Sequence, residues 1–192
     1  MTSTTISAPA AGASTTWQLD PAHTNVEFSV KHLMLARVKG RFTGVAGTVM
    51  LAAEPTASTV EVVIDAASID TREAKRDAHL RSADFFDVER FPTIAFRSRE
   101  VRPTGGGEFS VVGDLTIRDV TREVTLEATE EGRGTDPWGG ERAGFSATAE
   151  IDRRDFGLTW NQALEAGGVL VGNEIRIALE VELVKQAAAE AA

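Results

Sequence analysis

The sequence contains no cysteine and no tyrosine, and aromatic residues make up only 6% of its 192 residues. Without cysteine the chain has no disulfide framework, no thiolate nucleophile and no zinc–thiolate site. Because aromatics are few, small and branched aliphatic side chains must fill most of the interior, and a hydrophobic content of 42% is sufficient for a sizeable core.

Positive charge is also scarce, since 20 Lys and Arg against 29 Asp and Glu give a formal net charge of −9. Nucleic acid and anionic membrane surfaces repel such a chain, so neither is an expected partner. No apolar run approaches the ~18 residues needed to span a bilayer, so we expect no stable membrane insertion. Residues 1–16 lack the basic start and the apolar stretch of a secretory signal, which predicts a cytoplasmic protein.

The length fits one domain, and no internal linker or tandem repeat divides the chain. Residues 1–16 read as a flexible N-terminal arm, residues 17–185 as the domain itself, and residues 186–192 as a flexible C-terminal tail.

Apolar and polar residues alternate along most of the domain, which is the pattern of half-buried strands. Val26, Phe28 and Val30, for example, alternate with polar residues. With one glycine-containing stretch added, the alternation predicts eight strands, over 25–31, 37–51, 59–65, 94–99, 109–118, 123–128, 145–152 and 174–183. Hairpin turn signals between them predict an antiparallel sheet, and eight strands can close into a barrel around their own side chains or one ligand.

Two segments interrupt the alternation. Residues 72–82 predict one short helix, with Ser68, Asp70 or Thr71 as its N-cap. Residues 154–168 are irregular but carry several apolar side chains. Both segments have the composition of material that closes the ends of a barrel.

The inward faces of the strands predict either a filled core or a lumen that holds an apolar molecule. Small inward residues and the extra apolar groups of the two irregular segments favour a lumen. Face parity predicts the lining residues, with the last three at the mouths: Phe28, Val30, Phe42, Val62, Ile64, Phe96, Leu115, Ile117, Phe145, Leu179, Phe86, Phe156 and Trp160.

Several motifs carry a resemblance to a known family. They follow one another without large gaps from residue 17 to residue 184, which makes the match highly specific. They include Asp20-Pro-Ala-His23, Ser68-Ile-Asp-Thr71, His79-Leu-Arg-Ser82, Asp84-Phe-Phe-Asp87 and Arg154-Asp-Phe-Gly157. On these motifs the chain resembles the YceI-like family of polyisoprenoid-binding, lipocalin-like proteins. Two departures are Arg72 or Glu73, where the family often has glycine, and the missing export signal, since many members are periplasmic.

The resemblance implies an eight-stranded antiparallel barrel that holds an isoprenoid chain in an apolar tunnel, in some members as a homodimer. It favours non-catalytic binding, carriage or sequestration of a long-chain isoprenoid, with no cofactor. An enzyme acting on a small apolar substrate in the same cavity, and a stress-related structural protein with a filled barrel, are the alternatives.

Polar candidates for a ligand site are few. Arg72, Arg76 and His79 share one face of the predicted helix and could meet an anionic head group beside a tunnel mouth. The three histidines, His23, His32 and His79, lie in separate elements without metal-site spacing, so no metal site is expected. Asp20 and His23 could form an acid–base pair, although a hydrogen-bonded turn explains them equally well.

Overall fold

The computed structural model describes residues 14–165 and 167–187. Its strands are β1 (Thr15–Leu19), β2 (Asn25–His32), β3 (Ala36–Phe42), β4 (Val45–Leu51), β5 (Thr59–Asp65), β6 (Ile69–Asp70), β7 (Thr93–Gly105), β8 (Glu108–Ile117), β9 (Val120–Thr135), β10 (Glu141–Asp152) and β11 (Val171–Lys185). The helices are α1 (Ala74–Arg81) and the single-turn 3₁₀ helices η1 (Pro55–Ala57), η2 (Ala66–Ser68) and η3 (Arg153–Phe156). Most of the expected arm and tail lies outside the described residues.

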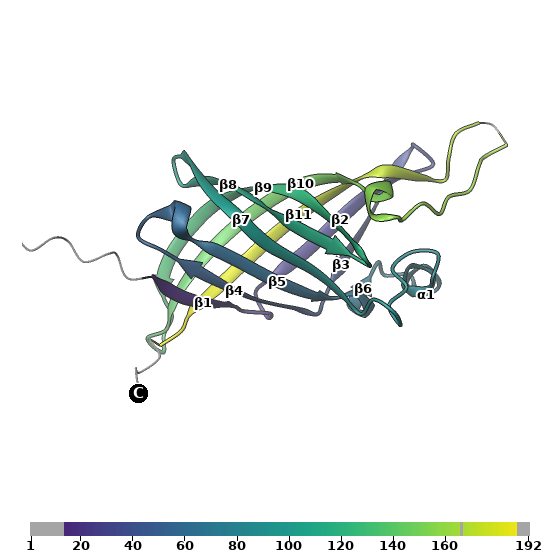
Figure 1. The fold of residues 1–192 in the computed structure, drawn as a ribbon. Helices are drawn as coiled ribbons and strands as arrows, with labels where there is room; N and C mark the ends of the chain where they lie inside the picture. The colour runs from purple at the N-terminus through teal and green to yellow at the C-terminus, as the bar shows by residue number, and fades with distance from the viewer. Residues whose placement is uncertain (1–13, 166, 188–192) are drawn as a thin grey trace, which may run out of the picture.

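The strands form one closed antiparallel barrel (Figure 1). β11 pairs with β10 on one side and with both β1 and β2 on the other, which closes the sheet. β1 and β2 both pair with β11, so they occupy one position in the barrel. β4 pairs with β1 and β3 pairs with β2, so β3 and β4 occupy the next position. β5 pairs with β4 and β6 pairs with β3, so β5 and β6 occupy the third. The eleven strands therefore occupy eight positions, which confirms the eight-stranded antiparallel barrel predicted from the alternation.

Both irregular segments lie at the same end of the barrel, where α1 and the segment after η3 project beyond the strands (Figure 1). The two segments contact each other, since the ring centroids of His79 and Trp160 are 4.6 Å apart and those of Phe85 and Trp160 are 5.4 Å apart. The opposite end carries the β7–β8 and β9–β10 turns.

Helix α1 is shorter than the sequence predicts, and its N-cap is Glu73, whose carboxylate accepts from the backbone N–H groups of Lys75 and Arg76. The three predicted caps were wrong. Asp70 instead accepts from the backbone N–H of Arg72, and Arg72 has a φ of 60°, in the left-handed region that favours glycine. This backbone conformation gives a physical reason for glycine at this position in the family that the sequence resembles.

Among the described residues, no helix is long and apolar enough to cross a membrane.

Candidate ligand-binding site

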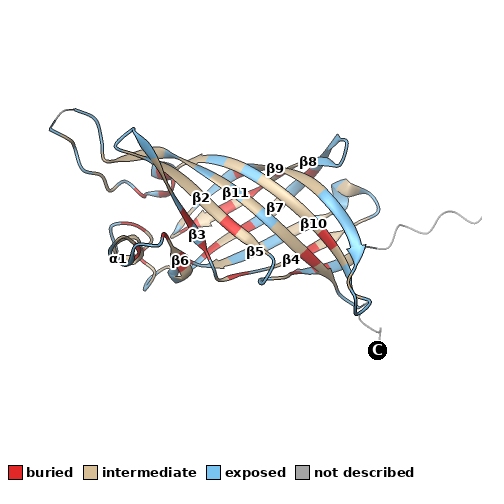
Figure 2. Cartoon of the chain, turned by 180° about the vertical axis from the view of Figure 1, so that it is seen from behind, coloured by how far each residue is buried: buried red, intermediate tan, exposed pale blue. Residues whose placement is uncertain are grey.

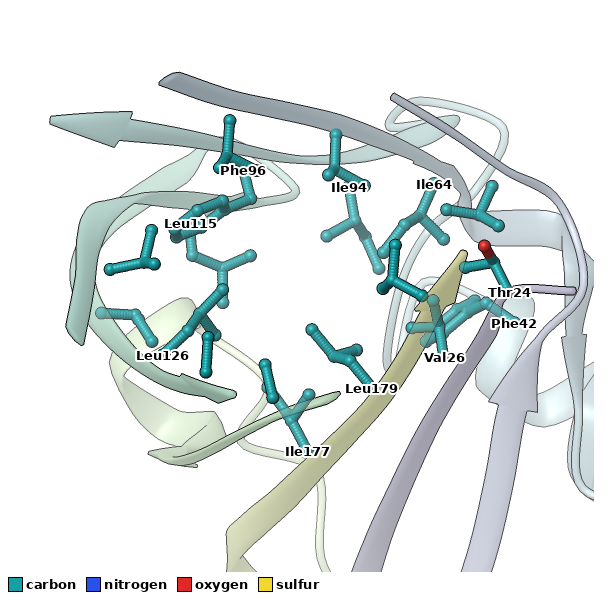
Figure 3. Close-up of a pocket in the computed structure, with 18 of the residues that line it drawn as sticks. Thr24, Val26, Phe42, Ile64, Ile94, Phe96, Leu115, Leu126, Ile177 and Leu179 are labelled. Atoms are coloured by element: carbon teal, nitrogen blue, oxygen red, sulfur yellow. The ribbon is translucent and has the colours of Figure 1, made fainter. Parts of the chain in front are cut away.

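The barrel encloses a cavity of about 340 Å³, within the range of roughly 300–1,000 Å³ typical of ligand pockets. Figure 3 shows the side chains of Phe96, Leu115 and Leu179 pointing into it from different parts of the wall. Inward-facing strand residues such as Phe28, Val30 and Leu179 are only partly buried, and partly buried positions (tan) recur along the strands in Figure 2. The interior is therefore not filled by its own side chains, which argues against the filled-barrel alternative.

The wall of the cavity is almost entirely aliphatic and aromatic. Eleven of the thirteen residues predicted to line the lumen or its mouths lie on this wall: Phe28, Val30, Phe42, Val62, Ile64, Phe86, Phe96, Leu115, Ile117, Phe145 and Leu179. Period-two alternation places the ten strand residues there, because every second side chain of a strand faces the lumen, whereas Phe86 reaches the wall from the segment between α1 and β7. Their contact with a ligand stays a prediction.

Phe156 and Trp160 do not line the cavity. Phe156 is 1% exposed and packs in the hydrophobic core instead. Trp160 packs against His79 and Phe85 between the two irregular segments. Face parity could not place either residue because both lie outside the strands.

Close approach of neighbouring strands shapes the wall at Gly40. Gly40 pairs with Phe28 across β2 and β3, and the Phe28 ring lies over the glycine. A Cβ at position 40 would lie 2.7 Å from Phe28 Cε1 and 2.8 Å from Thr71 Cγ2. The missing side chain therefore allows the ring to lie against the wall, beside Phe42 at a centroid distance of 5.7 Å.

Arg153 is a buried cation on the cavity wall and was not predicted. It is 4% exposed, and burial lowers the pKa of its guanidinium. Its Nε donates to the carbonyl of Gly172 at 2.9 Å, and Nη1 donates to the carbonyls of Leu158 and Trp160. These hydrogen bonds link the irregular segment that follows η3 to the start of β11.

Thr24 is the second unpredicted polar group at the cavity. It lies between β1 and β2, and its buried Oγ1 makes no hydrogen bond within the described part of the chain. Figure 3 shows this hydroxyl beside the aliphatic side chains of the wall. A lone hydroxyl in an apolar wall is a free hydrogen-bonding group for a guest molecule.

The predicted head-group residues lie at the end of the barrel that carries α1. Arg76 donates from Nε to Thr71 Oγ1 at 2.7 Å and from Nη2 to the Thr71 carbonyl at 2.8 Å. His79 Nε2 lies 2.9 Å from Asp84 Oδ2. Arg72 is exposed and precedes the helix, so it does not share a helical face with the other two.

Asp20 and His23 are hydrogen-bonded on the outside of the barrel, with His23 Nδ1 2.9 Å from Asp20 Oδ2. Arg142 also donates to Asp20, at 2.7 Å, and to Glu182 and Asp136. The bonds from His23 and Arg142 lower the pKa of Asp20 to about 2, and the bond to Asp20 raises the pKa of His23. This arrangement is a turn held by ion pairs.

Asp20, His23 and Glu182 are also the one group of potential metal-ligand side chains among the described residues, and His32 and His79 are not part of it. Arg142 donates to both carboxylates of the group. Its guanidinium already supplies the positive charge that the two carboxylates can share, so this arrangement favours an ion-pair cluster over a metal site.

A closed antiparallel barrel with an apolar lumen defines the class of lipocalin-like barrels. The YceI-like domain profile matches residues 17–183. The chain is 40% identical over 156 residues to a UPF0312 protein of Vibrio cholerae, in an alignment that covers 80% of this chain and 82% of the relative. It therefore belongs to the YceI-like domain family, as its motifs predicted.

Solved structures show the same fold. BcnA of Burkholderia cenocepacia superimposes with a TM-score of 0.75 at 23% identity, covering 85% of this chain and 98% of BcnA. A polyisoprenoid binding domain from Saccharophagus degradans superimposes with a TM-score of 0.66 at 14% identity, covering 88% of this chain and 98% of that domain.

Proposed function

We propose that this protein binds and carries a long-chain isoprenoid lipid in its lumen and does not transform it chemically. The observation that carries the proposal is the apolar cavity inside the closed barrel. Membership of the YceI-like family supports it, and the Saccharophagus degradans domain of the same fold is described as polyisoprenoid-binding.

The shape of the cavity favours a chain over a compact ligand. On β11 alone the lining residues run from Val171 to Leu183. At ~3.4 Å per residue and a strand tilt of ~40°, they span roughly 30 Å along the barrel axis. A volume of about 340 Å³ distributed over that length suits an extended chain better than a fused ring system.

The polar groups of the lumen favour binding over catalysis. The Arg153 guanidinium is held by backbone carbonyls, Ser58 Oγ accepts from the backbone N–H of Ala52, and Arg133 is paired with Glu130. Nucleophilic catalysis needs a nucleophile, a base and an orienting group together. Within the described residues, the lumen wall does not bring such a set together.

The head group belongs, in this proposal, at the end of the barrel that carries Arg72, Arg76 and His79, where cations could meet an anionic group. A cytoplasmic location and a homodimer stay predictions from the sequence and the resemblance.

Mass spectrometry of a solvent extract of the purified protein tests the proposal. We expect a co-purified prenyl lipid, or binding of an added one by the extracted and refolded protein. Ala147→Trp should abolish binding because Ala147 lines the cavity and the indole would occupy it. Val63→Trp is the matched control, since Val63 is 48% exposed. Absence of lipid together with failure to bind added prenyl lipid would remove the proposed function.

A further inference from the structure

One end of the barrel carries an exposed apolar projection, here called the apolar tip and made up of Leu33, Met34, Leu35 and Val169. Their exposed fractions are 37%, 56%, 88% and 37%. The backbone N–H of Leu33 donates to the carbonyl of Leu170 at 2.8 Å, which holds the β2–β3 turn beside the start of β11. In Figure 1 this turn lies at the same end as α1.

The turn that forms the apolar tip is built from unfavourable residues. Leu33 and Met34 have φ values of 54° and 58°, and the backbone N–H of Leu35 donates to the carbonyl of His32 at 3.0 Å. A β-turn with positive φ values at both central residues strongly prefers Asn-Gly. A side chain in this region costs roughly 1–2 kcal/mol per residue, so Leu-Met is unfavourable both for the backbone and for exposure to water.

Positive charge flanks the β2–β3 turn of the apolar tip although the chain as a whole is acidic, and Glu165 is the exposed carboxylate of the hairpin that carries Val169. Lys31, Arg37 and Lys39 flank the turn, and Lys31 lies directly opposite Arg37 in the pairing of β2 and β3. No Asp or Glu occurs between Glu27 and Glu54 in the sequence.

Only part of this charge is neutralised by the neighbouring strand. Arg37 pairs with Glu174 at 3.5 Å, whereas Lys31 and Lys39 have no ion-pair partner in the part of the chain that the structure describes. Like charges opposite each other destabilise a sheet. Glu174 offsets part of the repulsion between Lys31 and Arg37, and an approaching anionic surface would offset more of it.

We propose that the apolar tip docks the protein reversibly on an anionic lipid surface. The apolar side chains enter the boundary between head groups and acyl chains, and Lys31 and Lys39 contact the phosphates. The net charge of −9 opposes this contact at long range, but the local distribution of charge near the tip favours it within a Debye length. Docking in this orientation brings the α1 end of the barrel to the bilayer.

Vesicle flotation tests the proposal with bilayers that contain no isoprenoid, so the result does not depend on the contents of the lumen. We expect binding to vesicles of equal parts phosphatidylcholine and phosphatidylglycerol, weaker binding at high salt, and little binding to phosphatidylcholine alone. The double variant Leu33→Asn/Met34→Gly should lose binding roughly tenfold or more. The midpoint of its thermal unfolding should stay equal or rise, because Asn-Gly is the preferred sequence for this turn. A midpoint that does not fall shows that the variant is folded.

Two further variants complete the test. Lys31→Ser/Lys39→Ser should weaken binding to the mixed vesicles and reduce its dependence on salt. Trp138→Ser is the matched control, because Trp138 is 87% exposed but lies in the β9–β10 turn at the opposite end of the barrel. No binding by the wild-type protein, or equal losses in the Trp138 and Leu33/Met34 variants, would overturn the proposal. A wild-type dimer that the Leu33/Met34 variant converts to a monomer would instead assign the tip to a second copy of this chain.

Discussion

Replacing Gly40 by alanine probes how closely the inner wall of the barrel is packed. The new Cβ would lie 2.7 Å from Phe28 Cε1 and 2.8 Å from Thr71 Cγ2, well inside the optimal carbon–carbon separation of ~3.5–4.0 Å. The three closest atoms are all side-chain atoms, so the Phe28 ring has to move. Overpacking typically costs about 1–3 kcal/mol, and the better strand preference of alanine offsets about 0.5–1 kcal/mol of it. We expect a net loss of about 1–2 kcal/mol.

Gly144→Ala is the matched control because Gly144 also lies in a strand, β10, but its nearest heavy atom to a new Cβ is Glu131 Cβ at 3.7 Å. This substitution should leave the free energy of unfolding unchanged or raise it by up to about 1 kcal/mol. The two glycines therefore separate packing against the Phe28 ring from the general effect of removing a strand glycine.

Urea denaturation followed by tryptophan fluorescence measures both changes, since Trp17 is 2% exposed in the barrel wall and reports its unfolding. A double-mutant cycle with Phe28→Leu should show a favourable coupling of about 1 kcal/mol with Gly40→Ala, because leucine lacks the ring atoms that collide. Equal effects of Gly40→Ala and Gly144→Ala, or the absence of coupling to Phe28, would show that the Phe28 ring moves aside at no cost in stability and would refute the packing argument.

Two further predictions concern the charged groups. Asp20→Asn should lower stability at pH 7 by about 1–2 kcal/mol. The pKa of Asp20 is about 2 against an ordinary 3.8, which at about 1.4 kcal/mol per pKa unit gives about 2.5 kcal/mol, and solvent screening at this partly exposed turn reduces that value. The pKa of Asp20 is depressed in the folded form, so its contribution to stability is present above pH 4 and is lost as the pH falls towards 2. The free energies of unfolding of the wild type and the variant should therefore converge near pH 2. A difference that stays constant with pH would contradict the role given to the Asp20 carboxylate. Arg76→Ala should weaken binding of a phosphorylated prenyl lipid more than of the matching quinone, whereas equal losses in a titration would remove Arg76 from the head-group site.

The alternation of apolar residues predicted the fold and most of the cavity wall because it reports which face of each strand is buried. Phe96 and Leu115 are examples, lying opposite each other on adjacent strands and both facing the lumen. The same reasoning could not place Phe156 or Trp160, because a residue outside a strand has no face parity.

Polar features of the site gave little signal in the sequence. Arg153 stands in a charged run, and no local pattern shows that its guanidinium turns inward to bind carbonyls as far along the chain as Gly172. The helix cap was misassigned because Asp70 and Thr71 are preferred N-cap residues and Glu73 is not, while the left-handed backbone at Arg72 separates Asp70 and Thr71 from the start of the helix.

Energetics connects the lumen to the apolar tip. Each buried methylene contributes about 0.8 kcal/mol relative to water, so a five-carbon unit gives roughly 3–4 kcal/mol. A long chain taken from water would then exceed the practical affinity limit of roughly 18–21 kcal/mol, so in the proposed function the lipid is exchanged with a bilayer and not with bulk water. Net transfer between a bilayer and the lumen is close to neutral, because the chain is in an apolar environment in both places. The chain avoids the high free energy of bulk water on the way only if the barrel touches the membrane while the chain moves. The strained Leu33–Met34 turn and its flanking lysines lie at the α1 end of the barrel, where such a contact would shield a passing chain from water.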